Sequence, residues 1–267
     1  MKYEIHYSCC SHIGKRRNEN QDNFLCDGKY LGDDGDPKGF SMNGCTDHAQ
    51  PRVFSVFDGM GGEEHGEIAS LIAARCAATL KIGESPIEDL REYCSTANEA
   101  ICGFADDHGI GSMGTTAVII VFAENEINLC NIGDSKAFHF DGKKLEQISV
   151  DDYSVAFPGK KPTLSQNLGI PPAEMMIEPH FARGNYYDGD SYLLCSDGLT
   201  DMVSTEEITG ILAETVAGRQ KDVSKATEKL LQKALDNGGN DNITIILCRV
   251  ERGERGLFDK VFHFLLD

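Results

Sequence analysis

Several features that mark common protein classes are absent from this chain of 267 residues. No run of 18 apolar residues occurs, so no membrane-spanning helix is predicted. The opening MKYEIHYSCC has no basic stretch followed by an apolar one, and we therefore expect no secretory signal. Repeats, low-complexity tracts and Pro/Gly/Ser-rich linkers are also absent. A chain of this length can bury a substantial core, so the sequence favours a soluble globular protein.

Positive charge is scarce. The chain has 25 Lys and Arg residues against 43 Asp and Glu residues, which gives a formal net charge of −18 at pH 7. A protein this acidic is repelled by phosphate backbones and anionic membranes, so neither nucleic acid nor a membrane is expected as its main partner. The charge is compatible with a carboxylate-rich metal site, although most of these side chains must be solvated surface.

Paired metal-ligand spacings are absent among the cysteines and histidines. The ten Cys lie between Cys9 and Cys248 without a CxxC pair, and the eight His include no HExxH. This distribution excludes a zinc ribbon and a disulfide framework. We expect free cysteines, several of them packed as small hydrophobic residues, and histidines with structural or surface roles. A reducing cytoplasm is the expected setting.

Apolar periodicity divides the chain into short strands and consecutive helices. Strands are predicted at residues 3–10, 20–25, 52–57, 114–123, 126–132, 136–140, 144–148, 190–196 and 242–250. Helices are predicted at residues 63–81, 85–104, 204–216 and 221–236. Antiparallel hairpins combined with helix pairs favour two packed sheets with helices outside, rather than a doubly wound parallel sheet. The last segment, 251–267, has the pattern of an amphipathic tail.

The helix predicted at 63–81 is expected to bury the apolar positions that recur with helical spacing. These positions are Ile68, Ile72, Cys76 and Leu80. Two capping boxes are also expected, because a Ser precedes a Glu by three residues at Ser85 with Glu88 and at Ser204 with Glu207.

Acidic residues stand at the ends of apolar strands. Asp58 follows RVFSVF, Asp197 follows YLLCS and Asp241 precedes NITIIL, each with glycine close by. Asp22 lies in Asn20-Gln21-Asp22, at the start of the strand predicted at 20–25. Converging carboxylates resist ionisation unless a cation neutralises them, and hard oxygen donors suit Mg²⁺ or Mn²⁺. Taken singly, each position is more simply explained as an Asp-Gly turn or a strand cap.

Six blocks in a fixed order give these residues a common context. They are GKRRNENQDNF, VFDGMGGEEHGEIAS, SMGTTAVII, NIGDSKAF, LLCSDGLTDMV and GGNDNITIIL. The set resembles the metal-dependent type 2C (PPM) protein phosphatase family, particularly its short bacterial members. The resemblance implies an α+β fold, a four-layer αββα sandwich of two antiparallel sheets flanked by helix pairs. It assigns residues 1–250 to one phosphatase domain and leaves 251–267 as the tail.

The resemblance also implies a centre of two Mn²⁺ or Mg²⁺ ions. Asp58 matches the aspartate that bridges both ions, and Gly59 matches the residue whose backbone carbonyl binds one of them. Asp197 and Asp241 match the remaining aspartates of the centre. Asp22 matches the acid that holds metal-bound water. Hydrolysis is then direct, by attack of a metal-activated water on phosphorus, so no Ser or Cys nucleophile is required.

Residues around this centre are assigned by the same resemblance. Arg17 matches the arginine that binds phosphate oxygens, with Arg16 as its neighbour in the chain. Gln21 stands where many members have Glu, and Asn242 is expected to orient Asp241. The blocks Gly114-Thr115-Thr116 and Gly133-Asp134-Ser135 are expected to shape the site without taking part in the chemistry.

The sequence departs from the family pattern in two places. Met60 stands where some members have a His that serves as a candidate general acid. Gly111 and Ser112 stand where many bacterial members have an Asp that binds a third metal, and Asp106 and Asp107 are out of register. A third metal site is therefore not expected.

The function predicted from the sequence is that of a cytoplasmic phosphoserine/phosphothreonine protein phosphatase with a role in signalling. Its expected partners are phosphoproteins, a cognate serine/threonine kinase and that kinase's substrates, and the expected state is a monomer. Two alternatives stay open at this point. One is a phosphatase of small phosphoesters with the same centre, and the other is a catalytically inactive metal-binding scaffold.

Overall fold

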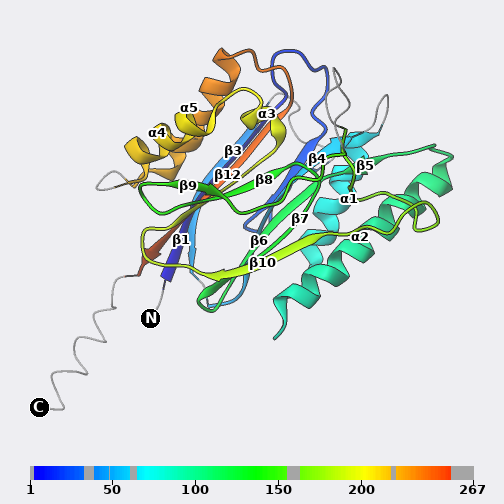
Figure 1. The fold of residues 1–267 in the computed structure, drawn as a ribbon, viewed down its shortest axis with the longest axis horizontal. Coiled ribbons are helices and arrows are strands. Elements are labelled where there is room, and N and C mark those ends of the chain that lie inside the picture. Colours follow the sequence, from blue (N-terminus) through cyan, green and yellow to red (C-terminus); the bar gives the residue numbers. More distant parts are fainter. Residues whose placement is uncertain are drawn as a thin grey trace, which may run out of the picture.

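Two antiparallel sheets lie face to face between two layers of helices in the computed structural model (Figure 1). The structure describes residues 3–32, 39–47, 49–60, 65–154, 163–217 and 221–253. This architecture confirms the predicted αββα sandwich. The part of the tail beyond Gly253 lies outside the described residues. No helix in the described ranges is long and apolar enough to cross a membrane.

The first sheet has the order β3-β1-β12-β11-β8-β9. Its strands are β1 (Tyr3–His12), β3 (Gly39–Asp47), β8 (Lys136–Phe140), β9 (Leu145–Gln147), β11 (Ser191–Cys195) and β12 (Ile243–Arg252). Three helices cover its outer face, namely α3 (Asp197–Thr200), α4 (Thr205–Thr215) and α5 (Val223–Asp236).

The second sheet has the order β10-β7-β6-β4-β2, and the short β5 pairs with β4. Its strands are β2 (Asp22–Cys26), β4 (Arg52–Met60), β5 (Gly114–Thr115), β6 (Ala117–Ala123), β7 (Glu126–Ile132) and β10 (His180–Asn185). Its outer face is covered by α1 (Gly66–Thr79) and α2 (Pro86–His108).

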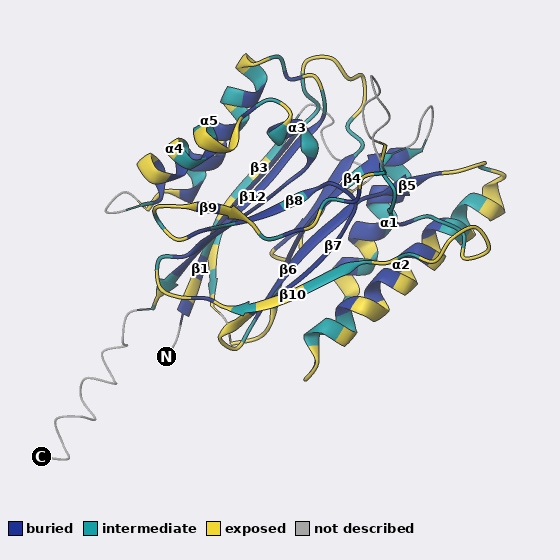
Figure 2. Cartoon of the chain, in the orientation of Figure 1, coloured by how far each residue is buried: buried dark blue, intermediate teal, exposed yellow. Residues whose placement is uncertain are grey.

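Strand alternation separates the apolar residues into a central core and two outer ones. On β1, Ile5, Tyr7 and Cys9 point between the sheets, where Phe54 and Phe122 of the second sheet pack with them. The positions in between point toward the helices. Figure 2 shows the central strands largely buried, the edge strand β10 intermediate or exposed, and the outward faces of the helices exposed. The faces of the central strands are occupied by packing, so a site is expected in the loops and strand ends at the edge of the two sheets.

The helix predicted at 63–81 is present as α1, but the prediction of which residues it buries was wrong. Ala69, Ala73 and Ala77 are buried, whereas Ile68 and Ile72 are only partly covered. The reason is the close approach of α1 to the sheet, which leaves room beneath the helix only for small side chains. The larger residues are displaced to its flanks, where they pack against the edge of the same core.

The two expected capping boxes have different outcomes. Ser204 accepts a hydrogen bond from the Glu207 backbone, and the Glu207 side chain accepts one from the Ser204 N–H, which confirms the box. The Ser85 side chain does not cap the helix, and its backbone carbonyl accepts from the N–H groups of Glu88 and Asp89. Ser85 has ψ 73° instead of the extended backbone of Ser204, so its hydroxyl is not placed to cap the helix.

Two strands, β3 and β10, were not predicted from the sequence. Both lie at sheet edges, where one long side of the strand has no neighbour in its sheet. Their burial alternates between half-covered and exposed, and their sequences GFSMNGCTD and HFARGN are largely polar. A strand without a buried face lacks the apolar pattern from which the central strands were recognised.

Candidate metal centre

Two of the predicted aspartates face each other across neighbouring strands. Asp22 at the start of β2 is directly opposite Asp58 near the end of β4. Asp22 is buried, and its Oδ2 accepts a hydrogen bond of 2.8 Å from the Ser196 hydroxyl. Its Oδ1 is buried without a hydrogen-bond partner. Burial raises the pKa of Asp22 to about 7, although the hydrogen bond from Ser196 opposes the shift.

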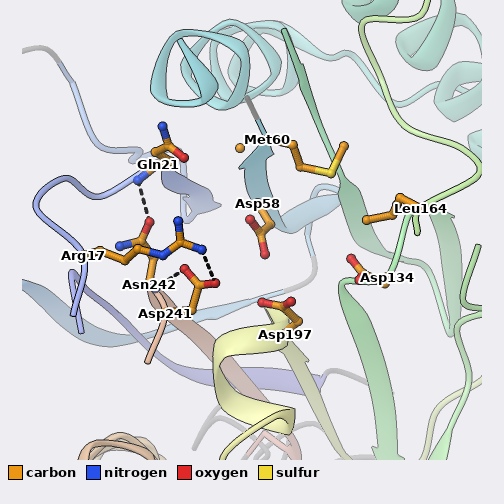
Figure 3. Close-up of a pocket in the computed structure, with 10 residues that line it drawn as sticks. Arg17, Gln21, Asp58, Met60, Asp134, Leu164, Asp197, Asp241 and Asn242 are labelled. Atoms are coloured by element: carbon orange, nitrogen blue, oxygen red, sulfur yellow. Dashed lines mark hydrogen bonds and ion pairs between the residues drawn. The ribbon is translucent and has the colours of Figure 1, made fainter. Parts of the chain in front are cut away.

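Three further carboxylates converge on Asp58. Burial raises the pKa of Asp58 well above its usual range, and the charges of Asp22, Asp197, Asp134 and Asp241 raise it further. Burial also raises the pKa of Asp197 to about 6, with further contributions from Asp134 and Asp241. In Figure 3 the side chains of Asp58, Asp134, Asp197 and Asp241 are directed toward a common space. Such a group is stable in its ionised form only when cations neutralise it.

A hollow of about 330 Å³ lies between these side chains at one end of the two sheets. Its walls come from loops and strand ends far apart in the sequence. The lining residues are Arg17, Gln21, Asp58, Gly59, Met60, Asp134, Leu164, Asp197, Asp241 and Asn242. Every site residue predicted from the sequence except Asp22 is among them, and Asp22 lies beneath Asp58 on the neighbouring strand.

Gly59 occupies a position where no side chain fits. A Cβ atom at this residue would lie 2.2 Å from the carbonyl oxygen of Gly66 and 2.4 Å from that of Gln21. Its N–H donates to the Gln21 carbonyl at 3.1 Å, so β4 is wedged between the approach to β2 and the start of α1. Glycine therefore lets the backbone beside Asp58 reach the hollow while both neighbours stay in contact.

Arg17 reaches the hollow from an exposed loop. Its Nη2 donates to Asp241 Oδ2 at 2.6 Å, while about half of the side chain remains exposed to solvent (Figure 3). The neighbouring Arg16 does not line the hollow. A guanidinium held by one carboxylate retains further N–H groups that can bind phosphate oxygens.

Asn242 anchors the loop that carries Arg17. Its side-chain amide donates to the carbonyls of Ile13 and Glu19, both at 2.9 Å, and its oxygen accepts from the Gln21 N–H at 2.8 Å. Its backbone N–H donates to Asp241 Oδ1, also at 2.8 Å. One residue thus fixes the loop around Arg17 and the orientation of Asp241 at the same time.

The donor set fits divalent cations of the Mg²⁺ and Mn²⁺ type. All the available ligands are oxygens, which hard cations prefer. The unpartnered Oδ1 of Asp22 is a buried polar atom without a protein partner, and such atoms are costly unless a water or an ion satisfies them. The raised pKa values of the aspartates have the same physical origin, an excess of negative charge with little water to solvate it.

Asp134 is a member of the group that the sequence analysis did not assign to the chemistry. It follows β7 in the turn Gly133-Asp134-Ser135 and lines the hollow beside Asp197. Burial raises its pKa, while the nearby Lys136 lowers it. The signal that could have revealed it is its context, since an acid directly after a buried strand is the pattern already recognised at Asp58 and Asp197.

The residues at the expected third-metal position lie elsewhere. Asp106, Gly111 and Ser112 line a separate hollow of about 290 Å³, and Met60 is the described residue that it shares with the first one. Asp107 is exposed and lines neither hollow. Met60 itself belongs to both walls, and its thioether carries no proton that it could donate to a leaving group.

Comparison with known proteins agrees with this geometry. The family model described as protein phosphatase 2C matches residues 41–237. The Mycobacterium tuberculosis serine/threonine protein phosphatase PstP is 33% identical over 224 residues, which cover 76% of this chain and 41% of PstP. The chain therefore spans about two fifths of the length of that relative. The Listeria monocytogenes serine/threonine phosphatase Stp is 29% identical, over 78% of this chain and 87% of Stp.

Solved structures show the same similarity in three dimensions. The crystal structure of M. tuberculosis PstP has a TM-score of 0.74 at 28% identity, covering 93% of this chain and all of that one. The PstP catalytic domain in complex with two manganese ions has a TM-score of 0.73 at 27% identity, covering 94% of this chain and all of that one.

Proposed function

The chain belongs to the protein phosphatase 2C family, and we propose that it is a metal-dependent phosphoprotein phosphatase acting on phosphoserine and phosphothreonine. The observation that carries this proposal is the convergence of Asp58, Asp197 and Asp241 with Arg17 on one hollow. This arrangement joins a site for cations to a group that binds phosphate. Relatives named serine/threonine phosphatases, one of them solved with two manganese ions, support the same activity.

The residues that would hold the two ions are those of the carboxylate group. Asp58 would bind both, Gly59 would contribute its carbonyl oxygen, Asp197 and Asp241 would complete the set, and Asp22 would act through water. Bound Mn²⁺ or Mg²⁺ supplies activation of water for attack on phosphorus and neutralises negative charge. Cation binding would offset the unfavourable free energy of burying several carboxylates close together.

The protein's own contribution to the reaction is orientation of the phosphoryl group. Arg17 would bind phosphate oxygens with the N–H groups that Asp241 leaves free, and Asn242 would keep its loop in place. A fixed guanidinium at this position also stabilises the charge that develops on the equatorial oxygens. Because Met60 carries no titratable group, the leaving serine or threonine oxygen would take its proton from water.

We propose a cytoplasmic signalling enzyme that acts as a monomer, opposes a cognate serine/threonine kinase, and has its phosphatase domain in residues 1–250. All ten cysteines are free, which is compatible with a reducing compartment. The net charge of −18 disfavours nucleic acid and anionic membranes as partners.

Turnover measurements test the proposed activity. The chain should hydrolyse a phosphothreonine peptide in the presence of Mn²⁺, lose the activity with a chelator, and lose it in Asp58→Asn. A higher kcat/KM for the phosphopeptide than for small phosphorylated metabolites is expected. The reverse preference would make the substrate a small phosphoester. Absence of turnover with any phosphoester, while Mn²⁺ still binds, would reduce the domain to a metal-binding scaffold.

A further inference from the structure

Four potential metal ligands gather on three adjacent strands of the first sheet. His6 on β1 is directly opposite Cys45 on β3, and Glu4 on β1 is directly opposite Glu251 on β12. Ile5, between Glu4 and His6, points into the core between the sheets. Glu4 and His6 therefore share the outer face, and both remain accessible to solvent together with Cys45.

The side chains of this group are already close to the spacing of metal ligands. His6 Nε2 lies 3.8 Å from Cys45 Sγ, 3.9 Å from Glu4 Oε2 and 4.0 Å from Glu251 Oε2. One ligand atom each from Glu4, His6 and Cys45 lies within 4.8 Å of the others. Tetrahedral zinc with ordinary bond lengths separates a nitrogen from a sulfur ligand by about 3.6 Å and from an oxygen ligand by about 3.4 Å. Shifts of a few tenths of an ångström would close the set.

We infer that Glu4, His6 and Cys45 form a second metal site, specific for a borderline-soft transition metal such as Zn²⁺. A thiolate, an imidazole and a carboxylate together are typical ligands of zinc, whereas the carboxylate centre offers only oxygen. Glu251 or a water supplies the fourth ligand. The two sites therefore differ in the class of metal that each prefers.

The charges around Cys45 explain why metal and proton compete there. Burial raises the pKa of the Cys45 thiol, and the charges of Glu4, Glu251 and Asp47 raise it further. Zn²⁺ binding replaces the thiol proton, which is released to solvent as the S–Zn bond forms. The cation also offsets the local negative charge, which Lys221 and Arg249 at Glu251 and Arg52 at Asp47 balance only in part.

The site lies far from the carboxylate centre. Strand β12 starts at Ile243, two residues after Asp241, and reaches Glu251 eight residues later, roughly 26 Å along an extended strand. In Figure 1 the start of β1 accordingly lies at the opposite end of the sheet from α3. A metal held there ties the edge strand β3 to β1, so its effect is on stability and on the reactivity of Cys45 rather than on phosphate chemistry.

Cobalt provides a probe that distinguishes the two sites. Co²⁺ bound to a thiolate gives a charge-transfer absorption in the near ultraviolet, which an all-oxygen site cannot produce. Titration of the metal-free full-length chain with Co²⁺ should develop this band to the intensity of one thiolate-bound ion per chain, and Zn²⁺ should abolish it. Cys45→Ser should remove the band, and His6→Gln should weaken Co²⁺ binding roughly tenfold or more. Cys102→Ser, which alters another partly exposed cysteine, is the matched control and should retain the band.

Alkylation gives an independent measurement. Zn²⁺ should slow the reaction of iodoacetamide with Cys45 and leave the rate at Cys102 unchanged, as followed by mass spectrometry. The Mn²⁺-dependent phosphatase activity of Cys45→Ser should equal that of the unsubstituted chain. Three results would each overturn a site built within one chain. The band could be absent, it could survive in Cys45→Ser, or it could appear only in a dimer separated by size-exclusion chromatography.

Discussion

Substituting Gly59 by Ala tests the packing that brings the backbone beside Asp58 into the hollow. The added methyl would lie 2.2 Å from the Gly66 carbonyl oxygen and 2.4 Å from the Gln21 carbonyl oxygen. Both contacts are with backbone, which cannot rotate away as a side chain can. To relieve them, α1 and the approach to β2 must separate, and Asp22 moves together with Gln21.

The magnitude follows from the two clashes. Over-packing a filled site costs about 1–3 kcal/mol, and two rigid partners place Gly59→Ala near the upper end of that range. Gly103 in α2 and Gly210 in α4 have open space around a built Cβ, so Ala at either position provides the control. These controls should be neutral or stabilising by up to about 1 kcal/mol, because Ala favours the helix more than Gly does.

Urea denaturation of the metal-free protein measures the effect on stability, and calorimetric titration with Mn²⁺ measures the effect on the centre. Gly59→Ala should lose about 2–3 kcal/mol of unfolding free energy and should bind Mn²⁺ more weakly. A variant that kept the stability of the original chain and its Mn²⁺ affinity would show that the close approach of the three backbones is not required.

Three further predictions concern the charged groups. Arg17→Ala should lose about 2–4 kcal/mol of transition-state stabilisation, seen as a fall in kcat/KM of roughly 30- to 900-fold, whereas Arg16→Ala should change it little; the opposite ranking would mean that Arg16 binds the phosphate. Mn²⁺ at a hundredfold excess over Kd should stabilise the protein by about 2.7 kcal/mol in a thermal melt, and Asp58→Asn should remove most of this gain. An equal rise in melting temperature in the original chain and in Asp58→Asn would place the metal elsewhere. Burial raises the pKa of Asp22 from 3.8 to about 7, so between these values the native metal-free protein holds a proton that the unfolded chain has released. The unfolding free energy should therefore fall by roughly 2 kcal/mol as the pH rises from 5 to 7. Asp22→Asn should reduce this slope in a pH series of urea denaturations, and the raised pKa values of Asp58 and Asp197 should leave a smaller one. An unchanged slope in the variant would assign the dependence to groups other than Asp22.

The parts of the fold that the sequence predicted are those with a buried periodic pattern. The central strands and both helix pairs were recognised from apolar spacing, and the aspartates of the site from their places at strand ends. The edge strands β3 and β10 were missed because neither has a buried face, and their sequences therefore lack the alternation of apolar and polar residues. The buried face of α1 was wrong because it depends on how closely the helix approaches Gly59, a distance that no local pattern encodes.

Long-range contacts account for the remaining differences at the site. Asp134 belongs to a turn whose sequence indicates a structural role, and it is the packing of the two sheets that brings it beside Asp197. Asn242 was predicted to orient Asp241, but its bonds to the loop before β2 were not, because they join residues more than 200 positions apart in the chain. His6 and Cys45 show no ligand spacing in the sequence because the pairing of β1 with β3 creates their proximity.

The most direct test of the metal-dependent account is anomalous diffraction from crystals of the full chain soaked in Mn²⁺. The account predicts two manganese peaks in the hollow, both in contact with Asp58, with Asp197 and Asp241 as further ligands and no such peaks in Asp58→Asn. Crystals that diffract well in saturating Mn²⁺ but show no anomalous density between these carboxylates would contradict it.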